Sequence, residues 1–351
     1  MMMKSHGMIR ALVISAFAIS AALADAHVAA AEDYYRGKKI FIVSASSAGG
    51  GYDQYARLLA RHIGKRIPGA PTVIVQNMPG AEGVKAANYI YNLAPQDGTY
   101  IGALPRSLSL SKLYGHHEQS LMFDPFNFQW LGSLKRDTGV LAVNTKSGLT
   151  APEDLRKREV TLSSQASNSP NSMYARMFNA LYGAKLKPIE GYEGSTAGML
   201  AVERFEVDGH LSGGTTAPLK NKLAGWINAG TGKVLVQFGM NRDMDYPDAP
   251  TVLDLIPEAE GRAVFELAFT EQEIGSPYVL GPKVAAAQMQ ILEKAFIETA
   301  RDADFLEEAR NENAPIYMLD AATIQAMLKK AYGAPSAITQ KLRDLANVKA
   351  H

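Results

Sequence analysis

Residues 44–51 are small and polar, end in three consecutive glycines, and are the residues of this chain best suited to holding a ligand. They follow an apolar, β-branched run at residues 40–43, and from Tyr52 onward apolar residues recur every three to four positions. The pattern predicts a strand, a glycine loop and a helix, whose backbone N–H groups and positive dipole end face the loop. The predicted chemistry is anion binding, with Asp53 capping the first helical turn. The alternative is an ordinary glycine loop that binds nothing.

The sequence offers little support for catalysis. Neither Gly-Lys-Ser/Thr nor a G-x-G-x-x-G spacing accompanies the glycine loop, which disfavours a nucleotide. The chain has no cysteine and no G-x-S-x-G motif, and His116-His117-Glu118 lacks the H-E-x-x-H spacing of a zinc site. His62 and His210 are expected to be packed or surface residues, and no pair of loop carboxylates stands out as acid and base. We therefore expect no catalytic residue, no metal and no cofactor.

Two further loops have the same character as the first. Residues 164–172 and 191–196 are rich in Gly, Ser, Thr and Asn, and each follows a predicted strand and precedes a predicted helix. Converging helix N-termini and hydroxyls suit a carboxylate without a matched arginine. Two lobes closing on such a ligand would be a hinge motion. The alternative for each serine is that it only caps a helix.

The predicted elements that would position these loops alternate between strands and helices. Strands are expected at 40–43, 72–76, 100–104, 124–134, 139–144, 160–163, 186–189, 207–211, 233–239 and 276–280. Helices are expected from Tyr52 and at 84–93, 170–182, 199–205, 250–256, 262–269, 284–300, 302–310, 321–332 and 336–345. Thr150 and Glu153 suggest a capping box. The alternation predicts an α/β protein with mostly parallel sheets and crossover helices, in which ligands bind at the carboxyl ends of the strands.

The N-terminal residues have the features of a secretory signal peptide. Lys4 and Arg10 precede an uncharged apolar run at residues 11–22, and small residues at 29–31 suit cleavage after Ala31; cleavage after Ala24 is the alternative. No later segment is long and apolar enough to span a bilayer, and no cysteine is present for lipid attachment. We expect residues 1–31 to be removed and the protein to be free in a bacterial periplasm.

Composition limits the partners. Removal of Lys4, Arg10 and Asp25 leaves equal numbers of basic and acidic side chains in the expected mature chain. A balanced charge argues against nucleic acid and against a charged membrane face. A chain of about 320 residues can bury a sizeable core without disulfides and is expected to form two lobes. We expect a monomer.

A family resemblance rests on motifs that follow one another along the chain. They are Ala48-Gly49-Gly50-x-x-Asp53-x-x-Ala56-Arg57, Val75-Gln76-Asn77-x-Pro79-Gly80-Ala81-x-Gly83, Pro95-x-Asp97-Gly98-Thr99, Asp124-Pro125, Gly191-Tyr192-x-Gly194, Glu206-Val207-Asp208, and Arg242 with Pro247-Asp248-Ala249-Pro250-Thr251. With them the chain resembles the tripartite tricarboxylate transporter receptors, which are the TctC or Bug periplasmic solute-binding proteins.

This resemblance implies a type II, Venus-flytrap periplasmic-binding fold, with lobe 1 at 32–135 and 245–351 and lobe 2 at 136–244. It implies capture of a small organic acid, usually a di- or tricarboxylate, and delivery to membrane permease subunits of the TctA and TctB type. The ligand-binding residues that it implies are Ser47, Ala48, Gly49, Gly50, Gly51, Tyr52, Asp53, Ser164, Gln165, Ser167, Asn168, Ser169, Asn171, Ser172, Tyr192, Gly194 and Ser195.

The chain also departs from the family pattern. The second-lobe loop carries serines, Gln165 and Asn168 where family members usually have glycines, and Glu82 replaces a small residue. An aromatic, longer or less charged acid is therefore allowed. Arg106 and Arg136 are expected at the surface, near the lobe edges; the alternative is that they supply a cation to the site. Two other functions stay open: an exported sensor component that reports its bound state to a histidine kinase, and a secreted α/β hydrolase.

Overall fold

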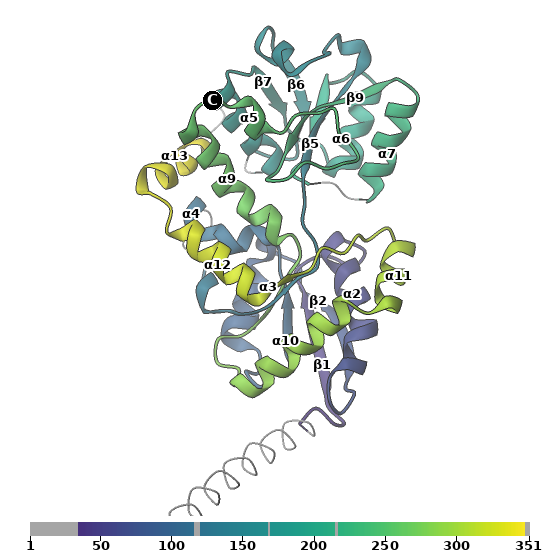
Figure 1. Cartoon of the computed structure of the whole chain (residues 1–351), viewed down its shortest axis with the longest axis vertical. Helices are drawn as coiled ribbons and strands as arrows, with labels where there is room; N and C mark the ends of the chain where they lie inside the picture. The colour runs from purple at the N-terminus through teal and green to yellow at the C-terminus, as the bar shows by residue number, and fades with distance from the viewer. Residues whose placement is uncertain (1–33, 116–119, 168, 215–216, 348–351) are drawn as a thin grey trace, which may run out of the picture.

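The computed structural model describes residues 34–115, 120–167, 169–214 and 217–347. The expected signal peptide, His116-His117-Glu118 and Asn168 lie outside the described residues. Two bodies follow one another along the long axis of the molecule, each built on its own β-sheet (Figure 1). The α/β, two-lobed fold expected from the sequence is therefore confirmed.

Lobe 1 is built on a six-stranded sheet with the order β11-β4-β10-β3-β1-β2. Its strands are β1 (Lys39–Ser44), β2 (Thr72–Asn77), β3 (Tyr100–Ala103), β4 (Gln129–Ser133), β10 (Pro277–Leu280) and β11 (Leu319–Asp320). Strand β1 lies between β3 and β2, and Ile40 and Ile42 on it are fully buried. They pack in one apolar cluster with Leu58 and Leu59 of the first helix, which explains why that helix covers this sheet.

Lobe 2 is built on a five-stranded sheet with the order β7-β6-β8-β5-β9. Its strands are β5 (Gly139–Asn144), β6 (Val160–Ser163), β7 (Leu186–Ile189), β8 (Gly209–Leu211) and β9 (Gly232–Phe238). All the strands of this sheet lie within the predicted range of lobe 2, and those of the other sheet lie within the predicted ranges of lobe 1. The boundary residues themselves stay a prediction.

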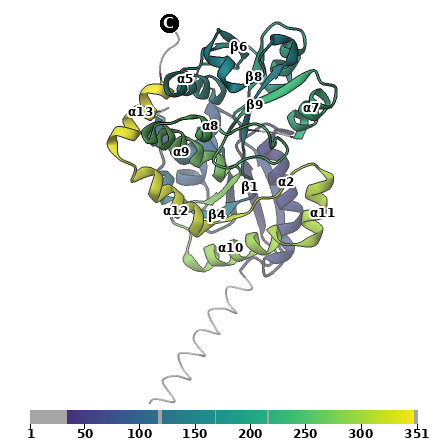
Figure 2. The same ribbon diagram turned by 45° about the horizontal axis from the view of Figure 1, so that its top comes forward.

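Helices cover both sheets, and some of them lie where the two lobes meet (Figures 1 and 2). They are α2 (Gly51–Ile63), α3 (Val84–Asn88), α4 (Ser111–Tyr114), α5 (Pro170–Tyr182), α6 (Gly194–Glu203), α7 (Ala217–Asn228), α8 (Val252–Leu255), α9 (Ala259–Ile274), α10 (Ala286–Ala300), α11 (Ala303–Asn311), α12 (Ala321–Tyr332) and α13 (Ser336–Ala346). Short 3-10 turns include η2 (Ala81–Gly83), η4 (Arg106–Leu110), η5 (Pro125–Asn127) and η7 (Pro152–Arg156). Within the described residues, no helix is both long and apolar enough to cross a membrane.

Most strands of each sheet point the same way, as predicted, but both sheets are mixed because each also contains antiparallel neighbours. Strands β1, β2 and β3 run parallel, but β10 is antiparallel to β3 and β4. In lobe 2, β5 is antiparallel to β8 and β9. The reason is the path of the chain: β10 and β5 each begin where the chain has just crossed from the other lobe. They therefore run away from the lobe interface, whereas β1, β3, β6 and β8 end near it.

Several predicted elements differ in extent. The helix expected at 262–269 is α9, Ala259–Ile274, because buried polar residues at its C-terminal end obscure the apolar period. The strand expected from residue 124 begins at Gln129, after η5. The expected capping box with Glu153 is wrong. The Asp154 carboxylate instead accepts hydrogen bonds from the backbone N–H groups of Thr150 (2.9 Å) and Ala151 (3.1 Å).

The C-terminal helix α13 contacts both lobes. From lobe 2, the Arg176 guanidinium on α5 donates hydrogen bonds to the backbone oxygens of Leu345 (3.3 Å) and Ala346 (2.5 Å). From α13 itself, the Arg343 guanidinium donates 2.8 Å to the backbone oxygen of Leu113 on α4 in lobe 1. Helix α13 therefore links the two lobes.

Candidate ligand-binding site

A cavity of about 760 Å³ lies between the lobes, a size within the range of small-molecule sites. From lobe 1 it is lined by the loop after β1, by the glycine loop after β2 and by η4, which follows β3. From lobe 2 it is lined by the loop between β6 and α5, by the start of α6 and by the residues after β8. The carboxyl ends of strands from both sheets thus meet at one cavity, as the rule for open α/β sheets predicts.

Three helices begin at this cavity. Its lining includes Gly51 and Tyr52 at the start of α2, Ser169 and Asn171 at the start of α5, and Ser195 in the first turn of α6. Pro170 occupies the first position of α5, where the missing N–H costs nothing. The unpaired N–H groups and positive dipole ends of three helices therefore face a shared space, which favours an anionic group there.

The structure brings only part of the predicted site to the cavity. Of the predicted residues, those that line it are Gly51, Tyr52, Gln165, Ser169, Asn171 and Ser195. The described residues that lie outside its lining are Ser47, Ala48, Gly49, Gly50, Asp53, Ser164, Ser167, Ser172, Tyr192 and Gly194. The cavity lining also includes Ala45 and Ser46, which belong to the first loop but were not among the predicted ligand-binding residues.

Asp53 supports the first loop from behind. Its carboxylate accepts hydrogen bonds from the backbone N–H of Gly49 (2.8 Å), from Nε of Arg57 (2.8 Å) and from Nδ2 of Asn77 (2.7 Å). Burial alone would raise the pKa of this carboxyl, but the hydrogen bonds lower it below its ordinary value. Asp53 therefore fixes the shape of the loop rather than lining the cavity.

The serines of the second-lobe loop form a buried network. The Ser164 hydroxyl lies 3.0 Å from the Ser169 hydroxyl and 2.7 Å from the Ser172 hydroxyl. Ser169 also donates to the backbone oxygen of Ala166 at 2.7 Å. Of these three serines only Ser169 lines the cavity. The hydroxyl-rich composition of this loop thus serves mainly to hold the loop together at the start of α5.

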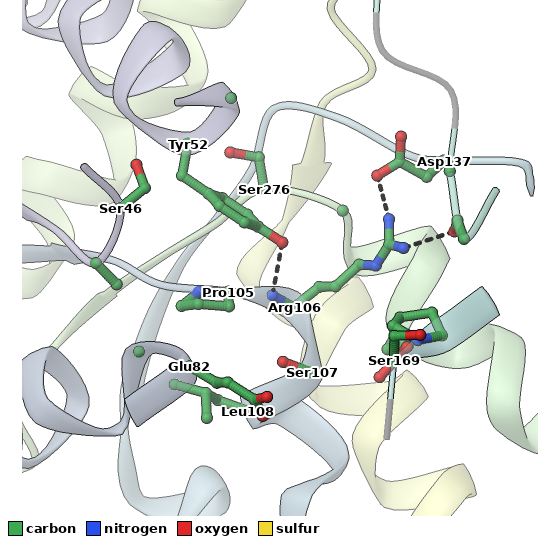
Figure 3. Close-up of a pocket in the computed structure, with 18 of the residues that line it drawn as sticks. Ser46, Tyr52, Glu82, Pro105, Arg106, Ser107, Leu108, Asp137, Ser169 and Ser276 are labelled. Atoms are coloured by element: carbon green, nitrogen blue, oxygen red, sulfur yellow. Dashed lines mark hydrogen bonds and ion pairs between the residues drawn. The ribbon is translucent and has the colours of Figure 1, made fainter. Parts of the chain in front are cut away.

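The expectation of a surface position is wrong for Arg106. Its side chain is only 11% exposed and lies in the cavity wall. The guanidinium pairs with Asp137 and donates a 2.6 Å hydrogen bond to the backbone oxygen of Gly213 in lobe 2 (Figure 3). The Arg106 backbone N–H donates to the Tyr52 hydroxyl at 3.2 Å (Figure 3). Arg106 therefore joins the two lobes across the cavity. Arg136 instead stacks on the ring of Tyr317 at 3.7 Å.

The segments that cross between the lobes supply further cavity residues. Lys135 Nζ lies 2.6 Å from Oδ1 of Asp137, and both residues line the cavity. The crossing segments are hydrogen-bonded to each other, since the backbone N–H of Asp137 donates to the Gln272 oxygen at 2.9 Å. Gly275 is required there: its φ is +34°, and a Cβ would lie 2.0 Å from the Lys135 oxygen. Two closely packed segments of the chain therefore connect the lobes.

Glu271 is the most buried acid of the cavity wall. It lies near the end of α9, is 2% exposed, and lines the cavity. Burial raises the pKa of its carboxyl to about 7, although the charge of Arg106 and a hydrogen bond with Tyr114 act in the opposite direction. No local signal in the sequence indicates Lys135, Asp137 or Glu271 as site residues. For Arg106 one was present, since it follows a predicted strand at its carboxyl end.

A buried serine–histidine pair lies outside the cavity. The hydroxyl of Ser163 is 2.8 Å from Nδ1 of His210, a contact that the sequence did not indicate. Ser163 is 0% exposed and His210 is 2% exposed, and neither lines the cavity. Burial lowers the pKa of His210 to about 4, while the contact with Ser163 acts to raise it. The pair has the atoms of a nucleophile and a base but no access to a substrate. Within the described residues no cluster of His, Asp or Glu is suited to a metal.

Comparison with known proteins identifies the fold. No protein-family model matches the sequence, and no curated protein matches it. Among solved structures, a TctC solute-binding protein from Polaromonas without ligand is similar, with a TM-score of 0.66, 16% identity, and coverage of 89% of this chain and 99% of that one. The periplasmic binding protein BugD has a TM-score of 0.61 at 18% identity, covering 89% of this chain and 98% of its own.

MatC from Rhodopseudomonas palustris with bound malate is also similar, with a TM-score of 0.59, 14% identity, and coverage of 88% of this chain and 99% of that one. The identities are low, yet the match extends over almost the whole of each partner and over both lobes. The fold implied by the sequence motifs is therefore confirmed. This chain has the two-lobed fold of the TctC and Bug periplasmic binding proteins.

Proposed function

We propose that this protein is a periplasmic receptor that captures a small organic acid between its two lobes without transforming it. The observation that carries the proposal is the convergence of the N-termini of α2, α5 and α6 on one cavity between the lobes. A carboxylate bound there would contact both lobes, and contacts made only when the lobes are closed would favour the closed state. The malate bound to MatC is a precedent for an acid in this fold.

Delivery to a membrane permease of the TctA and TctB type and export to the periplasm belong to the same proposal. Export predicts that the protein purified from a periplasmic extract lacks about the first 31 residues, which mass spectrometry of the intact chain would measure. Delivery predicts that deleting the gene abolishes uptake of the labelled ligand by whole cells. Uptake that continues unchanged would separate ligand binding from transport and would favour the sensor alternative.

Ligand capture is tested by thermal unfolding with a panel of aliphatic, aromatic and hydroxy acids. A ligand at about a hundred times its dissociation constant should stabilise the protein by roughly 2.7 kcal/mol. Ser195→Arg would place a long side chain in the cavity wall and should abolish the shift. Thr196→Arg is the matched control, because Thr196 is exposed and does not line the cavity. Equal shifts in both variants would place the ligand elsewhere, and turnover of a bound acid would contradict a receptor.

A further inference from the structure

The charges around the cavity do not suit a ligand with several negative charges. Among the lining residues two are basic, Arg106 and Lys135, and three are acidic: Glu82, Asp137 and Glu271. Both basic side chains contact the same carboxylate, that of Asp137. A di- or tricarboxylate would therefore enter a cavity whose cations already have a partner and whose carboxyl groups repel it. A ligand with a single carboxylate meets less repulsion.

Glu271 is placed to recognise a second group on such a ligand. It lies in the cavity wall and its residue is 98% buried, since only 2% is exposed. One of its carboxyl oxygens, Oε2, is buried and receives no hydrogen bond from any residue in the described ranges, so a ligand group would reach it once the side chain turns into the cavity. The charged and titratable groups that act on it are Arg106 from η4, Tyr114 from α4, Tyr174 from α5 and Tyr52 from α2.

A buried carboxyl oxygen without a donor is costly. Leaving a buried polar atom unsatisfied is unfavourable, and more so for a charged group. The nearby cation cannot supply the missing bond without giving up its own contacts, because the Arg106 guanidinium is held by Asp137 and by the Gly213 oxygen. The donor that would satisfy Oε2 at least cost is a group brought in by the ligand.

We propose that Glu271 determines ligand specificity by accepting a hydrogen bond from a donor group of the ligand, an ammonium above all, with a hydroxyl or amide as weaker partners. The ligand class is thus a small acid that carries one carboxylate and, in addition, an N–H or O–H donor. This inference rests on the proposed function and names the substrate class of the same cavity.

Isothermal titration calorimetry with matched acids tests the inference. The purified protein is titrated at pH 8, where Glu271 is ionised, with hexanoate, 6-hydroxyhexanoate, 6-aminohexanoate and adipate, and with the corresponding series of about four to eight carbons. A charge-assisted hydrogen bond is worth about 1.5–3 kcal/mol. At the best chain length, the ammonium-ended acid should therefore bind at least tenfold tighter than the methyl-ended acid, and the dicarboxylate should bind least well.

Two variants separate a role in specificity from a role in folding. Glu271→Gln keeps the shape and removes the charge, so the ratio of the affinities for the ammonium-ended and the methyl-ended acid should fall from at least tenfold to near one. Glu266→Gln, on the exposed face of the same helix α9, should behave as the unaltered protein. The preference in the unaltered protein stands as a test even where a variant fails to fold.

The outcomes distinguish the inference from the function on which it rests. Equal affinity for methyl-ended and ammonium-ended acids, or a preference that persists in Glu271→Gln, would overturn the role of Glu271 and leave the receptor in place. Tightest binding of the dicarboxylate would overturn the ligand class. Failure of every acid to bind, in these series and in the broader panel, would overturn both proposals.

Discussion

Nδ2 of Asn77 donates a 2.7 Å hydrogen bond to Oδ1 of Asp53, and this bond joins the two glycine loops of lobe 1. Asn77 is the last residue of β2, and Asp53 lies in the first turn of α2. The same amide nitrogen donates to the Ser46 oxygen at 3.0 Å. The hydrogen bonds of the Asp53 carboxylate therefore hold both loops in position.

Replacing Asp53 should loosen the first loop. Asp53→Ala leaves the donors of Gly49, Arg57 and Asn77 without their acceptor, so the free energy of unfolding should fall by about 1–3 kcal/mol. Urea unfolding at pH 7 measures this loss. Asp248→Ala is the control, because Asp248 is exposed, and it should change stability by less than about 0.5 kcal/mol.

The loss of the Asp53 carboxylate should also have a defined pH dependence. The folded pKa of Asp53 lies below its unfolded value, so its contribution is present above the unfolded pKa of about 4 and is lost as pH falls through the folded value. The stability difference between the unaltered protein and Asp53→Asn should therefore shrink below about pH 4. A difference that stays constant down to pH 3 would contradict this role.

In the absence of ligand, the Asp137 carboxylate should stabilise the cavity wall. Its side chain is 6% exposed and pairs with Arg106 and Lys135. Asp137→Asn leaves two cations without a full counter-charge, and breaking a buried pair typically costs about 3–5 kcal/mol. An acid ligand can then replace the lost carboxylate, so the rise in Tm on adding ligand should be larger in this variant than in the unaltered protein.

The matched control for that prediction is an exposed ion pair. Lys187 and Glu159 are 3.0 Å apart with side chains 55% and 60% exposed, so Glu159→Gln should cost less than about 1 kcal/mol. It should leave the ligand-induced rise in Tm unchanged. A smaller rise in Asp137→Asn than in the unaltered protein would show that Asp137 contacts the ligand favourably rather than competing with it.

The sequence allowed the local units to be predicted well, because their signals are local. Helix α5 was expected at 170–182 and spans Pro170–Tyr182, since Pro170 suits its first position and Gly183 adopts the left-handed φ of +82° that ends it. The strand, loop and helix around Gly51 were predicted for the same reason. Three of the loops that line the cavity followed from these units.

The other half of the cavity was not predictable in this way. Lys135 and Glu271 lie at or beside the segments where the chain crosses between lobes, and their neighbours there are distant in sequence. The hydrogen bond between the backbones of Asp137 and Gln272 joins residues with no shared local pattern. The antiparallel direction of β10 also depends on this crossing. Tertiary position, rather than residue type, makes these residues part of the site.

Glu271 should make the protein less stable as pH rises. Its carboxyl has a pKa of about 7 in the folded protein against about 4.3 in an unfolded chain. Between these values the folded state holds a proton that the unfolded state has lost, so the contribution of Glu271 to stability falls as pH rises from about 4.5 to 7 and is then constant. In Glu271→Gln this fall should disappear, which amounts to a gain on the order of 2–3 kcal/mol at pH 8 relative to pH 5. If the free energy of unfolding changed with pH in the same way in both proteins, burial of the Glu271 charge would be contradicted.

His210 should change the stability of the protein in the direction opposite to Glu271, over almost the same pH range. Burial lowers its folded pKa to about 4, whereas an unfolded histidine titrates near 6.5. Between these values the unfolded state binds a proton that the folded state does not, so stability is lost as pH falls from about 6.5 to 4. His210→Gln should remove this loss, and Ser163→Ala should retain it, because the imidazole stays buried.

The two groups therefore oppose each other in the unaltered protein. The effects of Glu271 and His210 have opposite signs between about pH 4.5 and 6.5, so the stability of the unaltered protein should change little there. In each single variant one effect remains, and stability should change clearly with pH. Urea unfolding at half-unit steps of pH measures the three profiles. Stability that falls with rising pH in His210→Gln and rises with pH in Glu271→Gln would establish both buried groups. Flat profiles in the two variants would mean that neither group titrates differently in the folded and unfolded chains.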